Sequence, residues 1–250
     1  MDSPPILLTS SVVAMDTSGL LKDQDLRIFH TLESIEKWAE IAPKNKFVIC
    51  DGSGYDFAPL LKQRFPHLMI ECLYFLNNLK KIKIHGKGFG EGEIIRYALN
   101  NSLFLKETNW FAKCTAKLWV NNFSQCVEEW NGYFLCKAFF SQVFSLRKTR
   151  LEYIDTRFYL ADKSFYEKFL SEAHQNLGGD GGLSIEEKFL EVTLMEGLSG
   201  ILFKNSPIVS GVSGGSGKYY NTSHLRLIKE LLRSKFVSLN PKFKKLFNRE

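Results

Sequence analysis

Apolar runs of strand length alternate with helical patterns over the first 120 residues, and this alternation limits the possible folds most. The runs cover residues 6–14, 46–50 and 70–75, and a fourth begins at Trp110. Helices are expected between them over residues 31–38 and 58–64, and from Gly86 onwards. Strands that alternate with helices pair in parallel and carry helices on both faces of the sheet. The sequence therefore predicts a mixed, mostly parallel α/β sheet flanked by helices.

The pattern is less regular after residue 121. We expect a short helix over residues 124–130, strands over 133–140 and 151–160, and helices over 164–173 and 184–195. Ser184 and Glu187 form a capping box for the last of these helices. Glycine-rich loops are expected at residues 178–182 and 211–217. The predicted organisation is one domain over residues 1–221, with a regular half up to about residue 120 and an irregular half from 121, followed by a tail over 222–250.

The tail carries the net charge. Residues 222–250 contain eight basic and two acidic residues, which accounts for the whole net charge of +6. Because the rest of the chain is neutral, nucleic-acid binding is not expected. Leu225, Ile228, Leu232 and Phe236 share one helical face. Such a basic amphipathic helix can lie on an anionic membrane surface, or it can pack against the domain with a solvated basic edge.

Targeting signals are weak. The first 16 residues lack a basic segment, and no apolar stretch approaches the roughly 18 residues that a membrane span needs. The five cysteines are an odd number and form no CxxC pair, which favours reduced thiols. We therefore expect a cytoplasmic protein that can lie peripherally at the inner face of the plasma membrane.

Two glycine-rich strings fail the spacing of known nucleotide motifs. The first, from Gly86 to Gly92, lacks the gap that a dinucleotide fingerprint needs before its third glycine. In the second, Val212 stands where a phosphate loop needs glycine, and Tyr219 stands where it needs Ser or Thr. The five histidines show no zinc-ligand spacing, and Cys114 is better explained as a packed residue than as a nucleophile. ATP or GTP hydrolysis is therefore not expected.

Polar residues follow the predicted strands and open the helix after Gly86. The carboxyl ends of parallel strands meet at one edge of a sheet, which is where ligands bind in open α/β folds. Glycines at a helix start let an anion approach free N–H groups. The candidate residues at this edge are Thr9, Ser10, Asp51, Ser53, Lys87, Gly88, Gly90, Glu91, Lys113 and Thr115.

In the order of these elements and in the loop Asp51-Gly52-Ser53, the chain resembles the nucleotide-sugar half of GT-A fold glycosyltransferases. The resemblance covers about residues 6–117 and is nearest to the large inverting family with a D-G-S-x-x-D-like loop, in which Asp56 completes the pattern. It implies that Asp51 contacts the nucleotide base or ribose, that Ser53 shapes the loop, and that residues 87–91 line the sugar diphosphate. It further implies transfer of a sugar from a nucleotide diphosphate to a glycan or lipid-linked glycan. The weak targeting signals and the basic tail suggest a bacterial-type enzyme of lipopolysaccharide or polysaccharide synthesis.

One departure concerns the metal. At the end of the fourth strand the family carries D-x-D, which holds Mn²⁺ or Mg²⁺, and this chain has Lys113-Cys114-Thr115. Lys113 and Lys117 can replace the metal, the acidic ligand can come from Asp155 in Asp155-Thr156-Arg157 with Arg157 on the donor, or neither explanation holds. No cofactor is firmly implied.

An inverting transferase also needs a carboxylate base. Glu186 and Glu187 fit the family's position for it, and Asp155 is the rival. Glu187 can instead be a helix cap, and Asp155 a strand-end turn residue.

Two other functions stay open. A non-catalytic nucleotide- or glycan-binding module would explain the missing D-x-D, and a sugar nucleotidyltransferase would need a G-x-G-x-R-type loop in place of residues 14–18.

Overall fold

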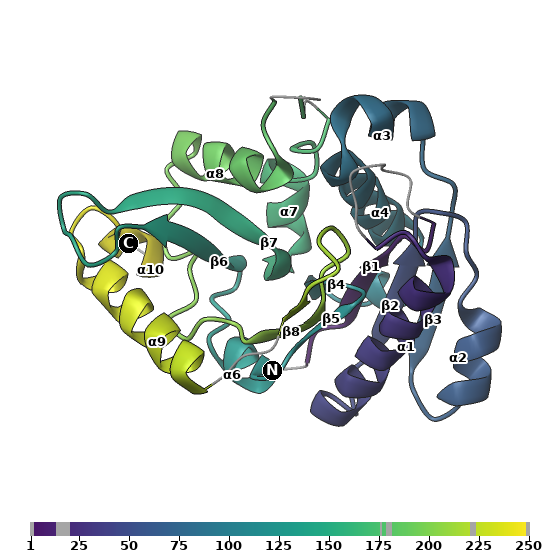
Figure 1. The fold of residues 1–250 in the computed structure, drawn as a ribbon. Helices are drawn as coiled ribbons and strands as arrows, with labels where there is room; N and C mark the ends of the chain where they lie inside the picture. Colours follow the sequence, from purple (N-terminus) through teal and green to yellow (C-terminus); the bar gives the residue numbers. More distant parts are fainter. Residues whose placement is uncertain (1–2, 14–20, 176, 179–181, 221–223, 249–250) are drawn as a thin grey trace.

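The computed structural model describes residues 3–13, 21–175, 177–178, 182–220 and 224–248, with side chains from residue 227 onwards in the last range. It contains a six-stranded sheet with helices on both faces (Figure 1). The sheet order is β3-β2-β1-β4-β7-β6, and β5, β8 and β9 form a second, smaller sheet. The prediction of a mixed, mostly parallel α/β sheet flanked by helices is confirmed.

The elements have the following bounds. The strands are β1 (Ile6–Ser10), β2 (Phe47–Asp51), β3 (Ile70–Tyr74), β4 (Trp110–Thr115), β5 (Leu118–Val120), β6 (Phe134–Ser141), β7 (Arg150–Asp162), β8 (Val209–Val212) and β9 (Tyr219–Tyr220). The helices are α1 (Gln24–Ile41), α2 (Ala58–Arg64), α3 (Leu79–His85), α4 (Lys87–Asn101), α5 (Leu103–Lys106), α6 (Phe123–Glu128), α7 (Lys163–Phe169), α8 (Ile185–Met195), α9 (His224–Leu239) and α10 (Lys244–Phe247).

The first four strands of the large sheet run parallel, and β7 and β6 extend it as antiparallel strands on the β4 side. Ser10 lies beside Asp51 and Thr9 lies beside Thr115 in this register. The carboxyl ends of β1, β2 and β4 therefore meet at one edge. The polar residues predicted to lie there are brought together.

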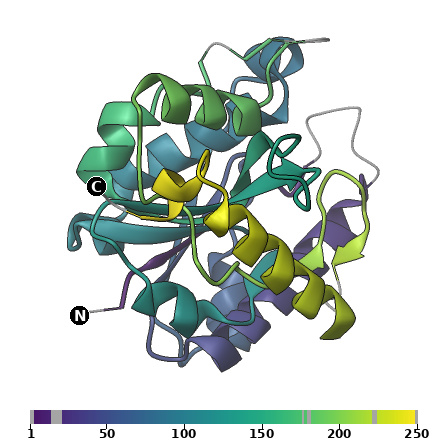
Figure 2. The same cartoon turned by 90° about the vertical axis from the view of Figure 1, so that its left-hand side faces the viewer.

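Two apolar cores cover the two faces of the sheet. One packs α4, α7 and α8 against residues such as Phe111 and Tyr159, and it also contains Val237 of α9 and Leu246 of α10. The other packs α1 and α2 against β1 and β2. In Figure 2 the green helices α7 and α8 lie above the sheet and the purple helix α1 lies below it. Trp38 fixes α1 to the small sheet because its Nε1 donates to the carbonyl of Leu118 at 2.9 Å.

Local signals place most boundaries. The helix predicted over 58–64 is α2, and the capping box of Ser184 and Glu187 is present at the start of α8. The helix predicted over 31–38 is longer because Asp23 caps it and accepts a hydrogen bond from Leu26 N. The strand predicted over 6–14 ends at Ser10, since Val12 N bonds to the side chain of Asp51 and not to a neighbouring strand. Residues 14–20 and 179–181, which include the loop considered for a nucleotidyltransferase, lie outside the described residues.

No helix in the described ranges combines the length and the apolar character needed to cross a bilayer.

Gly92 allows α4 to pack against the segment that follows α7. A Cβ at Gly92 would lie 2.1 Å from Cγ of His174, a buried side chain whose Nε2 contacts Glu93 at 2.6 Å. Gly92→Ala should therefore lower the free energy of unfolding by about 3 kcal/mol, because the imidazole cannot move without repacking the core. Urea unfolding measures this loss. Asn100→Ala is the matched control on the exposed side of the same helix, and equal stability of the two variants would contradict the packing account.

Candidate functional site

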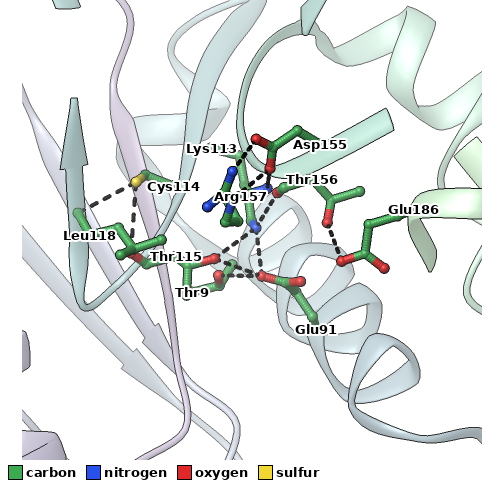
Figure 3. A network of polar contacts seen from close by, with 10 residues as sticks. All are labelled: Thr9, Glu91, Lys113, Cys114, Thr115, Leu118, Asp155, Thr156, Arg157 and Glu186. Atoms are coloured by element: carbon green, nitrogen blue, oxygen red, sulfur yellow. Dashed lines mark hydrogen bonds and ion pairs between the residues drawn. The ribbon is translucent and has the colours of Figure 1, made fainter. Parts of the chain in front are cut away.

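Four of the predicted residues form one hydrogen-bonded cluster at the carboxyl edge of the sheet (Figure 3). Lys113 Nζ lies 2.5 Å from Glu91 Oε1 and donates to the carbonyl of Thr156 at 2.7 Å. Thr9 Oγ1 donates to the same Glu91 oxygen at 3.0 Å, and Thr115 Oγ1 does so at 3.3 Å. Strands β1 and β4 and the first turns of α4 supply these side chains.

The charge of Lys113 is balanced inside the protein. Its side chain is fully buried, whereas the side chain of Glu91 keeps 25% of its surface exposed. Burial alone would raise the pKa of Glu91, but the Lys113 ammonium and the hydrogen bonds from Thr9 and Thr115 outweigh it and hold that pKa below its ordinary value. Lys113 is thus committed to an ion pair, and its role as a substitute for the metal stays a prediction.

Breaking this pair should be costly. Lys113→Met should lower the free energy of unfolding by about 3 kcal/mol, because it leaves the Glu91 carboxylate without its counter-ion in a largely buried position. Lys113→Met combined with Glu91→Gln should recover much of the loss, since the amide needs no counter-charge. Urea unfolding of the two single variants and the double variant measures the coupling. Equal losses in the Lys113→Met single variant and in the double variant would show that volume matters and charge does not.

Lys117 is the second cation, and it lies just beyond β4. The residue is only 3% exposed, and within the described ranges its ammonium has no hydrogen bond or ion pair. Burial, together with the nearby positive charge of Arg27, lowers the pKa of Lys117 to about 7 against the opposing charges of Asp51 and Glu91. A buried ammonium without a partner is costly in a folded protein. Lys117 follows β4 at the carboxyl edge of the sheet, where a cation can attract an anion.

The glycine-rich loop between β8 and β9 lies against Lys117 and Lys87. A Cβ at Gly214 would lie 3.6 Å from Lys117 Nζ, and one at Gly215 would lie 3.1 Å from Lys87 Nζ. In the part of the chain that the structure describes, neither the Gly214 nor the Gly215 amide donates a hydrogen bond. Two ammonium groups therefore lie against a loop with two N–H groups that donate no hydrogen bond among the described residues, and groups of these kinds bind phosphate oxygens in other folds.

Asp51 and Ser53 join the β2 loop to the end of β1. Asp51 is buried, and its two carboxylate oxygens accept hydrogen bonds from Val12 N at 3.0 Å and from Ser53 N at 2.7 Å. Ser53 Oγ accepts hydrogen bonds from Val12 N and Val13 N. Both residues hold backbone at the site edge. Contact of Asp51 with a nucleotide base stays a prediction.

Strand β7 has a bulge at residues 156–158, where its pairing with β6 is interrupted. Cys136 pairs with Tyr159 while Lys137 pairs with Asp155, so three intervening residues of β7 have no partner on β6 at this point. Bulges bend a strand and redirect its side chains. Arg157 forms a bidentate pair with Asp155, with Nε–Oδ1 at 2.8 Å and Nη2–Oδ2 at 2.6 Å.

The three candidate bases differ in how many hydrogen bonds and ion pairs their carboxylates already form within the protein. Asp155 is buried in its pair with Arg157. Glu187 caps α8, and the hydrogen bonds from Ser184 hold the pKa of Glu187 below its ordinary value. Glu186 accepts one long hydrogen bond, 3.3 Å from Thr156 Oγ1, and its side chain points toward the cluster in Figure 3. Glu186 is therefore the carboxylate best placed to accept a proton.

The remaining predicted residues have packing positions. Gly88 faces Leu177 and Ile185, and Gly90 faces Ile82, so both glycines permit close contact of α4 with its neighbours. Ser10 is buried, and its hydroxyl has no hydrogen-bond partner among the described residues. Cys114 is packed, and burial raises the pKa of its thiol to about 12, which agrees with a packed residue rather than a nucleophile.

Sequence reasoning missed two features of the site. The second glycine-rich loop lies against Lys117 and Lys87, and the positive charge of Arg27 helps to lower the pKa of Lys117. The spacing of residues 211–217 excluded a phosphate loop of the known type, but the glycines still bring backbone close to two lysines.

Within the described ranges, no three His, Cys, Asp or Glu side chains are grouped as metal ligands. The alternative in which Asp155 holds a metal stays a prediction.

Apart from the cluster at the sheet edge, a hollow of about 190 Å³, which we call the second hollow, lies between α6, β6, β9 and α9. Arg157 lies on its wall, where its guanidinium pairs with Asp155 and lies 4.9 Å from the ring centre of Tyr220. Lys137 and Glu230 form an ion pair at 2.7 Å on its wall. Its other polar and apolar walls include Asn122, Gln125, Phe139, Asn205 and Leu231.

No family model and no curated protein matches the chain. Among solved structures it is similar to a protein assigned as a nucleotide-diphospho-sugar transferase from Desulfovibrio desulfuricans G20. The two sequences are 10% identical, the match covers 81% of this chain and 80% of that chain, and the TM-score is 0.49. A glycosyltransferase involved in the glycosylation of the major capsid of PBCV-1 shows 12% identity, 80% of each chain covered and a TM-score of 0.45. A 4-diphosphocytidyl-2C-methyl-D-erythritol synthase shows 10% identity, covers 93% of this chain and 99% of that chain, and has a TM-score of 0.40. These similarities are too distant to carry an argument about activity, which must come from the residues of the site.

Proposed function

We propose that the chain is a glycosyltransferase that binds a nucleotide diphosphate-sugar at the carboxyl edge of the sheet. The observation that carries the proposal is Lys117, a residue only 3% exposed whose ammonium has no hydrogen bond or ion pair among the described residues, beside Lys87 and the loop of Gly214 and Gly215. When a sugar is transferred, the leaving diphosphate gains negative charge. Fixed cations and N–H groups can stabilise that charge in the way that a bound metal does in other enzymes.

The rest of the edge suits the nucleoside and the sugar. The loop of Asp51 and Ser53 forms one wall, as in the GT-A family that the chain resembles. Glu91 presents its partly exposed carboxylate beside Lys113, where it can accept hydrogen bonds from sugar hydroxyls. Lys113 and Lys117 therefore have different proposed roles. Lys113 positions Glu91, and Lys117 binds the diphosphate.

The acceptor is assigned to the second hollow. Aromatic faces next to amides and charged groups are typical of carbohydrate sites, and Tyr220, Phe139 and Arg157 provide them here. Glu186 is then the base that removes the proton from the attacking hydroxyl. The proposed acceptor is a glycan or lipid-linked glycan, as in the synthesis of a bacterial surface polysaccharide or lipopolysaccharide.

A screen of UDP-, GDP- and CMP-sugars tests the proposal by thermal shift and by release of the nucleotide. We expect one donor to stabilise the protein and to be consumed in the presence of EDTA. No stabilisation and no turnover with any donor would contradict the proposal. Donor binding without turnover under all conditions would favour a non-catalytic module, and activity lost in EDTA but restored by Mn²⁺ would favour a metal site at Asp155.

A further inference from the structure

The outward side of α9 is apolar. Ile228, Leu231, Leu232, Phe236 and Leu239 expose between 46% and 68% of their surface. The sequence left open whether the apolar stripe of this helix packs on the domain or faces outward, and its described part faces outward. Large apolar side chains gathered in one exposed patch indicate an interaction surface.

The loop between β6 and β7 extends this patch. Phe144 and Leu146 are 69% and 65% exposed, and the ring of Phe144 lies 5.3 Å from that of Phe236. In Figures 1 and 2 this loop and the yellow helices α9 and α10 lie next to each other at one end of the sheet. We call the exposed apolar residues of α9 together with Phe144 and Leu146 the end patch.

The inner side of α9 fixes this orientation. Val237 is buried in the core, and Arg233 Nη2 donates to the carbonyl of Phe140 at 2.9 Å. Asn240 Nδ2 donates to the carbonyl of Leu146 at 3.2 Å, which ties the loop to the end of the helix. The end patch is thus held outward by contacts on its far side, and it cannot turn inward without breaking them.

Exposed basic residues lie on the same elements as the end patch or directly beside them in the chain. Two acidic groups of these elements are already engaged, since Glu230 pairs with Lys137 and Glu152 accepts a hydrogen bond from Ser141. An apolar surface that shares its elements with lysine and arginine is complementary to an anionic bilayer, with the apolar side chains at the acyl boundary and the cations at the headgroups. The exposed basic residues of this end are Arg147, Lys148, Arg150, Lys229, Lys235, Lys242, Lys244 and Lys245.

We propose that the end patch docks the protein on the surface of an anionic lipid bilayer. A second copy of the chain fits less well, because a two-fold contact would place these lysines against the same lysines. Leu231 belongs both to the end patch and to the wall of the second hollow. If that hollow holds the acceptor, which rests on the proposed function, docking brings it close to the headgroup of a lipid-linked acceptor.

Vesicle flotation tests the docking without any donor or acceptor. The protein should float with vesicles that contain phosphatidylglycerol and should not float with pure phosphatidylcholine, and binding should weaken with salt. Lys235→Gln and Lys242→Gln should each weaken binding on the order of fivefold. Lys80→Gln and Lys83→Gln, two exposed lysines on α3, are the matched controls and should have little effect.

The apolar part of the end patch has its own control. Phe144→Ser combined with Leu239→Ser should abolish flotation, whereas Leu194→Ser with Met195→Ser, exposed apolar residues at the end of α8, should not. Thermal unfolding should be unchanged in the lysine variants, so loss of their binding cannot come from misfolding. Absence of flotation on anionic vesicles at low salt would overturn the proposal. So would a dimer in solution that the same variants dissociate, because the occupant would then be a second copy.

Discussion

Replacing Lys117 with methionine should weaken binding of a nucleoside diphosphate, and reduce turnover of the donor, on the order of 10³-fold. The reason is that Lys117 provides a buried cation without a partner in the described ranges, so its charge is available for the diphosphate. Isothermal titration of the wild type and the variant in EDTA at pH 6.5 measures the change. Lys83→Met, at an exposed position on α3, is the control and should bind like the wild type.

The same substitution should not destabilise the protein. Removing a buried ammonium that lies near Arg27 relieves a desolvation cost, so the free energy of unfolding should stay equal or rise. A large loss of stability in Lys117→Met would contradict the assignment, because it would show that the ammonium has a partner within the protein.

The pH dependence follows from the pKa of Lys117. Its pKa is about 7 in the folded chain against 10.5 for the ordinary side chain, so between these values the unfolded state holds more protons. Lys117 therefore makes stability rise from pH 7 to pH 10.5, and this contribution should vanish in Lys117→Met. Affinity for the diphosphate should change in the opposite direction and fall as pH rises above about 7, because the anion binds the protonated amine.

Glu186→Gln should slow sugar transfer by between 10²- and 10⁴-fold and leave donor affinity unchanged. Glu186 accepts only one long hydrogen bond within the protein, so its carboxylate is available to take the acceptor proton. Rates at saturating donor and acceptor measure the effect, and donor affinity is measured separately by titration.

Glu187→Gln is the matched control, one residue along the same helix. Glu187 closes the capping box with Ser184, so its substitution should cost about 1 kcal/mol of stability at most and leave the rate near that of the wild type. The opposite result, with Glu187→Gln inactive and Glu186→Gln active, would move the catalytic role to Glu187. Loss of activity only in Asp155→Asn would move it to the pair with Arg157.

The elements were predictable because their signals are local. The alternation of apolar strands and helical patterns indicates the sheet, and the spacing of Ser184 and Glu187 indicates the start of α8. The convergence of Thr9, Lys113 and Thr115 also follows from strand order, since residues at the carboxyl ends of parallel strands meet.

The roles of the two lysines were not predictable, because they depend on contacts between distant segments. Which lysine has a counter-ion is decided by the position of Glu91 on α4 relative to β4. The loop containing Gly214 reaches Lys117 only because β8 pairs with β5. The outward stripe of α9 shows the same limit, since an amphipathic pattern is identical whether its apolar side packs inward or faces a membrane.

The decisive experiment is a structure of the protein with a nucleoside diphosphate bound in the presence of EDTA. We expect phosphate oxygens within hydrogen-bond distance of Lys117 Nζ, with the amides of Gly214 and Gly215 and the ammonium of Lys87 beside them. We also expect the pair of Lys113 and Glu91 to stay intact. A diphosphate bound away from Lys117, or bound only when a metal is held by Asp155, would show that Lys117 does not bind the diphosphate.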